Sequence, residues 1–222
     1  MTDWRFWVDR GGTFTDLVAL APDGRLLVRK VLSEQPDTPG DPAVCALKAL
    51  LEVEASGDAT IEELRLGTTV ATNALLEGAG DDVVLVTNQG LADVLRIGDQ
   101  HRPDLFALQL QAPLFLAIAV EEVQGRLDPE GNAVTPLVLD GALEERLRAH
   151  HRQGVRSCAI ALMHAWRHPD HECRLEALAR AIGFTTVVCS HQVAPLPRLV
   201  PRGQTTLVEA AVARPLFGYL HQ

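Results

Sequence analysis

The chain has 222 residues, of which 47% are hydrophobic, and it carries a formal net charge of −9. This composition supports a substantial core and excludes wholesale disorder. The acidic balance argues against a nucleic-acid or anionic-membrane partner, and no apolar run approaches the ~20 residues that span a bilayer. We expect a cytoplasmic protein with free thiols, because no signal-peptide pattern opens the chain and four cysteines stand far apart, at Cys45, Cys158, Cys173 and Cys189.

The first 32 residues predict a meander of strands. Apolar runs occupy residues 4–8, 17–20 and 26–32, and Pro22-Asp23-Gly24 has the composition of a hairpin turn. Between the first two runs stands Asp9-Arg10-Gly11-Gly12-Thr13-Phe14-Thr15-Asp16. We therefore expect this acidic, glycine-rich segment to form a tight turn between strands.

This turn has the composition of a phosphate-binding loop. Two adjacent glycines let the backbone approach a ligand and expose its N–H groups to phosphate oxygens. Hydroxyl groups add donors, and a carboxylate can hold Mg²⁺ directly or through water. The loop is not of the Walker type, because no Gly-Lys-Ser/Thr follows and the next element is a strand. An ordinary hairpin turn with solvated aspartates is the alternative. The candidate phosphate contacts are Gly11, Gly12, Thr13, Thr15 and Asp16, and the candidate metal ligand is Asp9.

The next segment alternates helices and strands. Residues 39–55 predict a helix with Asp41-Pro42 at its start and an apolar face of Val44, Leu47, Leu50 and Leu51. A short strand at 64–66, a helix at 70–76, a buried strand at 83–87 and a short helix at 91–97 follow.

The second half starts irregularly and becomes regular. Prolines interrupt residues 98–136, where we expect one strand at 120–127 and a turn at 128–132. Then come a helix capped by Asp140, a strand at 155–163, a helix at 169–182 and a strand at 185–189. A final helix at 204–220 contains Pro215, which should kink or divide it. A meander followed by alternating helices and strands predicts an α/β domain with a mixed sheet.

A second motif, Gly67-Thr68-Thr69-Val70-Ala71-Thr72-Asn73, lies where a strand passes into a helix, so its hydroxyls and N–H groups suit an anion. Together the two motifs resemble the hydantoinase A / 5-oxoprolinase family of the actin-like ATPase superfamily. The resemblance continues at residues 95–98, at Met163-His164-Ala165-Trp166-Arg167 and at Ser190-His191. The chain departs from the family pattern at five positions. The family usually has His at the position of Leu66, a basic residue at those of Gly78 and Asp99, Glu at that of Gly125 and Asn at that of Glu209.

The resemblance implies a ribonuclease-H-like lobe that uses ATP and Mg²⁺ to open a cyclic amide, with a B-type partner subunit. In that reading the γ-phosphate activates the amide oxygen and water cleaves the ring bond. Asp9, Thr68, Thr69 and Asn73 would then be the catalytic residues, and Thr72 would lie near the phosphate or the substrate. A ketone carboxylase subunit, a small-molecule kinase and a non-catalytic assembly or regulatory module remain alternatives.

We also expect residues 1–222 to be only the N-terminal lobe of a longer protein, inactive alone. No second Asp-x-Gly-Gly-Thr-like turn follows residue 100. An apolar stripe near the end should be exposed and favour a homo-oligomer: Leu207, Ala210, Ala211, Leu216, Phe217 and Leu220. His164, His168 and His171 with Glu172 could bind a metal, but we interpret them as groups that satisfy the backbone at a strand end and a helix start.

Overall fold

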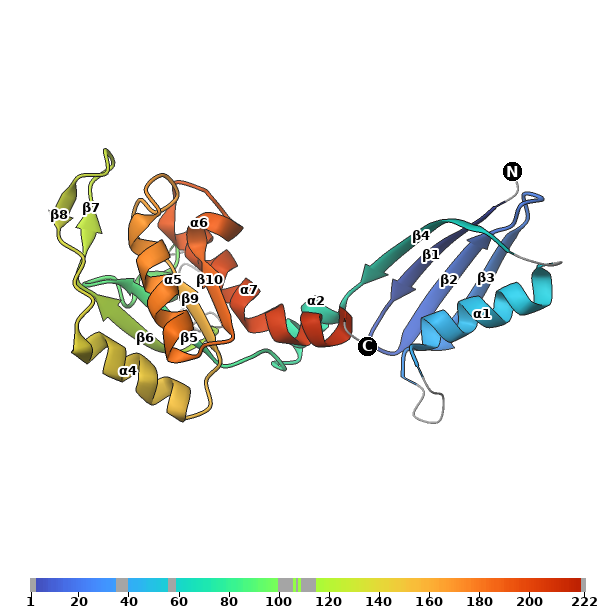
Figure 1. The fold of residues 1–222 in the computed structure, drawn as a ribbon, viewed down its shortest axis with the longest axis horizontal. Coiled ribbons are helices and arrows are strands. Elements are labelled where there is room, and N and C mark those ends of the chain that lie inside the picture. Colours follow the sequence, from blue (N-terminus) through green and yellow to red (C-terminus); the bar gives the residue numbers. More distant parts are fainter. Residues whose placement is uncertain are drawn as a thin grey trace. The chain divides into compact units, whose positions relative to one another are not determined.

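The computed structural model describes residues 3–34, 40–55, 59–99, 106, 108 and 115–220. The chain divides into two compact units (Figure 1), and each is described by itself. Unit 1 comprises Met1–Ala79 with Pro215–Gln222, and unit 2 comprises Gly80–Arg214.

Unit 1 is a mixed four-stranded sheet with one helix on its buried face (Figure 1). Strands β1 (Trp4–Arg10), β2 (Phe14–Leu20) and β3 (Leu26–Leu32) form the expected antiparallel meander. Strand β4 (Ile61–Thr68) pairs parallel to β1, which gives the order β3-β2-β1-β4. The strand is longer than residues 64–66, because its pairing with β1 extends over polar positions that carry no hydrophobic signal.

Helix α1 (Pro42–Glu54) begins where its sequence predicts. The Asp41 carboxylate accepts hydrogen bonds from the N–H groups of Ala43 and Val44, and so satisfies two donors of the first turn. Its buried face carries Ala43, Leu47 and Leu50, whereas Val44 is exposed, contrary to the predicted face. These residues pack on alternate side chains of the sheet, among them Phe6, Val8 and Leu17. The short helix α2 (Val70–Leu76) completes the unit as predicted.

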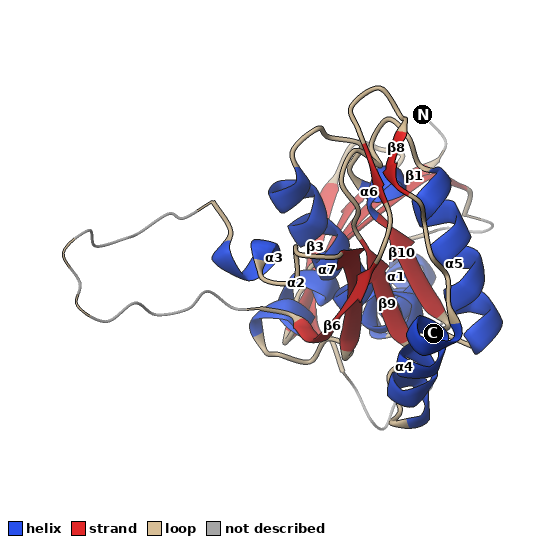
Figure 2. Cartoon of the chain, turned by 90° about the vertical axis from the view of Figure 1, so that its left-hand side faces the viewer, coloured by secondary structure: helices blue, strands red, loops and turns tan. Residues whose placement is uncertain are grey.

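Unit 2 contains a second sheet, which is entirely parallel and which the sequence interpretation as one mixed sheet did not anticipate. Its strands are β5 (Val83–Asn88), β6 (Ala117–Val123), β9 (Ser157–Ile160) and β10 (Thr186–Cys189), in the order β10-β9-β5-β6. Both faces are covered (Figure 2). Helices α4 (Gly141–Arg152) and α5 (Asp170–Ile182) pack on one face, and α7 (Leu199–Leu220) packs on the other. This double burial explains why β5 is buried along its whole length and apolar from Val83 to Val86.

Smaller elements connect these layers. Helix α3 (Val94–Ile97) follows β5, and helix α6 (Ser190–Val193) follows β10. Strands β7 (Arg126–Leu127) and β8 (Ala133–Thr135) form a hairpin around the predicted turn at 128–132. The single strand expected at 120–127 is wrong, because Gly125 has φ 150° and separates β6 from β7.

Helix α7 differs most from its prediction. It begins at Leu199 rather than at residue 204, since Pro201 lies in the first turn, where the missing N–H has no partner to lose. Pro215 lies inside the helix and does not end it, although the division between the units falls just before it.

The predicted exposed stripe is half wrong. Leu207, Ala210 and Ala211 are buried in the core of unit 2, and only Phe217 and Leu220 are largely exposed. Among the described helices, none is long and apolar enough to cross a bilayer.

Candidate functional site

The two glycine–threonine motifs meet at one end of the unit 1 sheet. Strand β1 lies between β2 and β4, so Asp9 is opposite Asp16 on one side and opposite Gly67 on the other. The Asp9 Oδ1 atom is 3.6 Å from the position that a Cβ of Gly67 would occupy. Asp9 and Gly67, one from each motif, are therefore neighbours at the end of β1 although 58 residues separate them in the sequence.

The turn between β1 and β2 lies against the start of α2. The Thr69 N–H donates a hydrogen bond to the Arg10 carbonyl at 3.1 Å, and the Asn73 side-chain amide is 3.3 Å from the Thr69 hydroxyl. A Cβ added at Gly12 would lie 3.0 Å from the Asn73 Nδ2 atom. Only glycine therefore lets the turn and the helix approach this closely without displacement of Asn73.

Most of the predicted site residues are open to solvent. Asp9, Gly12, Thr13, Thr68, Thr69 and Thr72 are exposed, and Gly11 and Asn73 are half-buried. The Asp9 carboxylate makes no hydrogen bond or ion pair with another described residue. The Thr68 hydroxyl instead accepts from the Val70 N–H at 3.2 Å. An open carboxylate beside glycine N–H groups can receive a cation together with a phosphate.

Thr15 and Asp16 are placed differently from the expectation. Thr15 is buried, and its hydroxyl lies 3.0 Å from the Ser33 hydroxyl, so it supports the turn from beneath rather than facing a ligand. Asp16 forms an ion pair with Lys30 at 2.7 Å. We therefore assign Thr15 to the support of the turn. The Asp16 carboxylate can contact a ligand only if its ion pair with Lys30 breaks or if the ligand joins that ion pair.

Sequence reasoning missed the residues that hold the turn. The Ser33 hydroxyl donates to the Gly11 carbonyl at 2.7 Å, and the Arg10 guanidinium bonds both the Ser33 carbonyl and the Asp41 carboxylate. Arg10 continues the two-residue period of buried side chains in β1, and that period was a usable signal for its inward direction. Ser33 and Lys30 could not be found this way, because their neighbours depend on the pairing register.

The departures from the family pattern have partial structural explanations. Gly78 has φ 67° after α2, a conformation that disfavours the basic residue of the pattern. At Gly125 a Cβ would meet the Leu137 Cα at 2.8 Å, so the family's glutamate would require a displacement of the backbone. Leu66 is 65% exposed on β4, and nothing in its surroundings explains the loss of a histidine there.

The histidines of the second half do not gather around a common point. The His168 ring contacts the Pro129 carbonyl at 3.1 Å, beside the β7–β8 turn, and Glu172 is fully buried. His164 does not end a strand as expected; it lies in a turn after β9 with φ 62°. Among the described residues, the group with metal-ligand spacing is instead Glu172, Cys189 and His191.

Comparison with known proteins shows the family of the chain. Residues 5–183 match the family described as the hydantoinase/oxoprolinase N-terminal region. The chain is 36% identical to 5-oxoprolinase 1 of Arabidopsis thaliana over 97% of this chain and 19% of that protein. It is 31% identical to the acetophenone carboxylase gamma subunit of Aromatoleum aromaticum, over 93% of this chain and 31% of that subunit.

Solved structures of two ATP-dependent enzymes have a similar fold. The ATP-dependent caprolactamase from Pseudomonas jessenii superposes with a TM-score of 0.75 and 29% identity, over 98% of this chain and 32% of that one. Nucleotide-free acetone carboxylase has the same TM-score at 22% identity, which is a likeness of fold alone. The chain thus spans 19% of the length of the first curated relatives and about a third of these structures.

Proposed function

Because the chain belongs to the hydantoinase/oxoprolinase family, we propose that it supplies the first phosphate-binding motif of an ATP-dependent enzyme that hydrolyses a cyclic amide. The substrate class follows the names of its relatives, which include 5-oxoprolinases and a caprolactamase. These relatives are much longer than this chain, which covers 19% of 5-oxoprolinase 1. We assign the activity to a complete protein of that length. A B-type partner subunit, self-association and a cytoplasmic location belong to the same proposal.

The observation that carries the proposal is the approach of Gly12 to Asn73 at the end of β1. Two motifs that were selected separately for their phosphate chemistry converge there, and Thr13, Thr68 and Thr69 stand open beside them. The residues also fit a magnesium–nucleotide. Mg²⁺ prefers one or two carboxylates together with phosphate oxygens and water, and Asp9 offers a carboxylate without a protein partner among the described residues. The bound ion would neutralise phosphate charge during transfer.

A second candidate function is an ATP-dependent ketone carboxylase subunit. It is supported by the acetophenone carboxylase gamma subunit, which matches at 31% identity over 93% of this chain. Such an enzyme would share the nucleotide site and differ in its substrate. Phosphate release by the complete protein should be compared with cyclic amides, with ketones plus bicarbonate and with sugars, because only the first group should stimulate it under our proposal.

Gly12→Ala should weaken Mg²⁺–ATP binding by the complete protein at least about tenfold, or ~1.4 kcal/mol. The added methyl group meets the Asn73 amide at 3.0 Å, so it occupies the approach to the turn and displaces a site residue. Titration calorimetry measures the change. Gly141→Ala is the matched control, because a Cβ at Gly141 meets no atom within 4 Å. Equal affinities for Gly12→Ala and the wild type would contradict the assignment of this turn.

A further inference from the structure

The turn after β9 in unit 2 has an unfavourable backbone conformation. Among the described residues, His164 alone combines a positive φ, of 62°, with a side chain. The Ala165 N–H donates to the Leu162 carbonyl at 3.4 Å, so His164 takes the third position of a turn, where a positive φ favours glycine. Residues held in this way are rare and cluster at active sites and ligand sites. The strain of His164 therefore requires an explanation.

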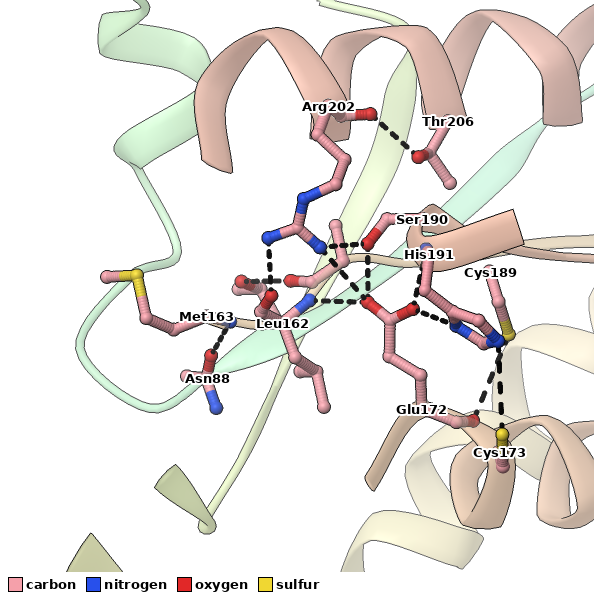
Figure 3. A network of polar contacts seen from close by, with 12 residues as sticks. Asn88, Leu162, Met163, Glu172, Cys173, Cys189, Ser190, His191, Arg202 and Thr206 are labelled. Carbon is pink, nitrogen blue, oxygen red and sulfur yellow. Dashed lines mark hydrogen bonds and ion pairs between the residues drawn. The ribbon is translucent and has the colours of Figure 1, made fainter. Parts of the chain in front are cut away.

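A buried polar network holds this turn in place (Figure 3). The Leu162 N–H donates to the Glu172 Oε1 atom at 2.8 Å, and the Leu162 carbonyl accepts from the Arg202 Nη2 atom at 2.8 Å. The next N–H, that of Met163, donates to the Asn88 Oδ1 atom at 2.7 Å. All three of these polar side chains are buried. Residues from β5, α5 and α7 thus fix the backbone just before the strained residue, and this is the condition under which such strain persists.

The turn also lies at the topological switch point of the parallel sheet. The strand order is β10-β9-β5-β6, so the chain goes from β5 to β6 on one side and then returns to β9 on the other side of β5. After β5 it passes to the face of α7, where Leu95 of α3 packs, and after β9 it passes to the face of α5. Open α/β sheets bind their ligands outside the carboxyl ends of the strands at such a point. The hydrogen bond between Asn88 and Met163 joins the carboxyl ends of the two strands concerned.

The imidazole of His164 is available to a ligand. The side chain is half-buried and makes no hydrogen bond or ion pair with another described residue. A neutral imidazole carries one donor and one acceptor, which suit the carbonyl and the N–H of an amide. We propose that His164 binds the cyclic amide at the carboxyl ends of β5 and β9, and that Glu172, Arg202 and Asn88 position it. The identity of the ligand rests on the proposed function, whereas the place of the site does not.

The first test is the substitution His164→Gly, because glycine adopts this conformation without strain. If the turn served only to connect β9 with α5, glycine would serve at least as well. In the complete protein we expect a stability to urea no lower than that of the wild type, since no hydrogen bond of the side chain is lost. The KM for the cyclic amide should nevertheless rise at least about tenfold, or ~1.4 kcal/mol, with the KM for Mg²⁺–ATP unchanged. His164→Asn should retain part of the binding, because asparagine tolerates a positive φ and keeps a donor and an acceptor.

The second test needs neither a variant nor turnover. Diethyl pyrocarbonate modifies accessible imidazoles, and mass spectrometry of peptides reads each histidine separately. In the wild-type complete protein without ATP, 5-oxoproline, caprolactam or hydantoin should protect His164 from modification. His151 on α4 is the matched control, because it is also half-buried and should react at the same rate with and without the amide.

The outcomes separate this inference from the proposed function. Cyclic amides that stimulate phosphate release but neither protect His164 nor have a raised KM in His164→Gly would overturn the site and leave the function intact. Protection of His164 without any stimulation would support the site and contradict the function. A His164→Gly protein that is less stable than the wild type would show that the turn is not strained, and would overturn the argument from strain.

Discussion

Replacement of Asp9 by asparagine should reduce the Mg²⁺-dependent release of phosphate by the complete protein about 100-fold or more, a cost of ~2.7 kcal/mol or above. The substitution removes a charge and keeps the shape of the side chain. Asp9 is exposed and has no protein partner among the described residues, so the fold of unit 1 should be unaffected. The lost charge is the one that we assign to the magnesium ion.

Asp23→Asn is the control for this effect. Asp23 belongs to the same unit and lies in the β2–β3 turn, and its ion pair among the described residues is with Arg25, two residues along the chain, at 2.7 Å. It should release phosphate at the wild-type rate. An Asp9→Asn enzyme with unchanged turnover would refute the magnesium assignment, and a change of the same size in Asp23→Asn would show that the effect is not specific.

Arg202→Met should destabilise unit 2 by about 3–5 kcal/mol, because it removes one partner of a buried ion pair. Arg202 and Glu172 are both fully buried, with 3.8 Å between the Arg202 Nη1 and Glu172 Oε1 atoms. The guanidinium also donates to the Ser190 hydroxyl and to the Leu162 carbonyl at 2.8 Å (Figure 3). Burial lowers the pKa of Arg202, while the Glu172 charge opposes this change. The variant leaves a buried carboxylate without its cation.

Hydrogen exchange can assign this loss to the correct unit. Peptides from β9 and β10 should lose protection in Arg202→Met, whereas peptides from β1 and β2 should keep theirs. Arg198→Met is the matched control, because Arg198 lies just before α7 and is exposed. If Arg202→Met lowers the free energy of unfolding of unit 2 by less than about 1 kcal/mol, the ion pair is not needed and hydrophobic packing alone holds this part of α7.

Local signals predicted most individual elements. Turn residues such as Pro22-Asp23-Gly24, the cap Asp41 and the apolar run from Val83 act through near neighbours, so the hairpin, α1 and β5 lie where expected. The second sheet could not be predicted. Whether β5 pairs with β4 or with β9 and β6 depends on contacts across the chain, and no periodicity records them. The early start of α7 at Leu199 places Pro201 in the first turn, where a proline is tolerated.

In the candidate site, too, local sequence predicted some residues, whereas others depend on contacts between distant parts of the chain. Gly12 and Asn73 were selected from their motifs, and the structure places them next to each other. A Cβ added at Gly12 would lie 3.0 Å from the Asn73 Nδ2 atom. Thr15 was assigned to the ligand because its hydroxyl is part of the motif, yet strand alternation turns it inward toward Ser33. Glu172, Cys189 and His191 were not associated, since their spacing has no short metal-binding pattern. They meet only after α5 has packed beside β10.

The most direct test of the account is an oxygen-tracing measurement with the complete enzyme. A cyclic amide that stimulates phosphate release is labelled with ¹⁸O at its ring carbonyl. If the γ-phosphate is transferred to that oxygen, a first water adds to the carbon and the ring C–N bond breaks as the nitrogen takes up a proton, which leaves an acyl phosphate. A second water then attacks the same carbon, the C–O bond breaks and the label leaves in inorganic phosphate. We predict one ¹⁸O atom per phosphate released. Label that remains entirely in the ring-opened carboxylate, or the absence of stimulation by any cyclic amide, would contradict the proposed function.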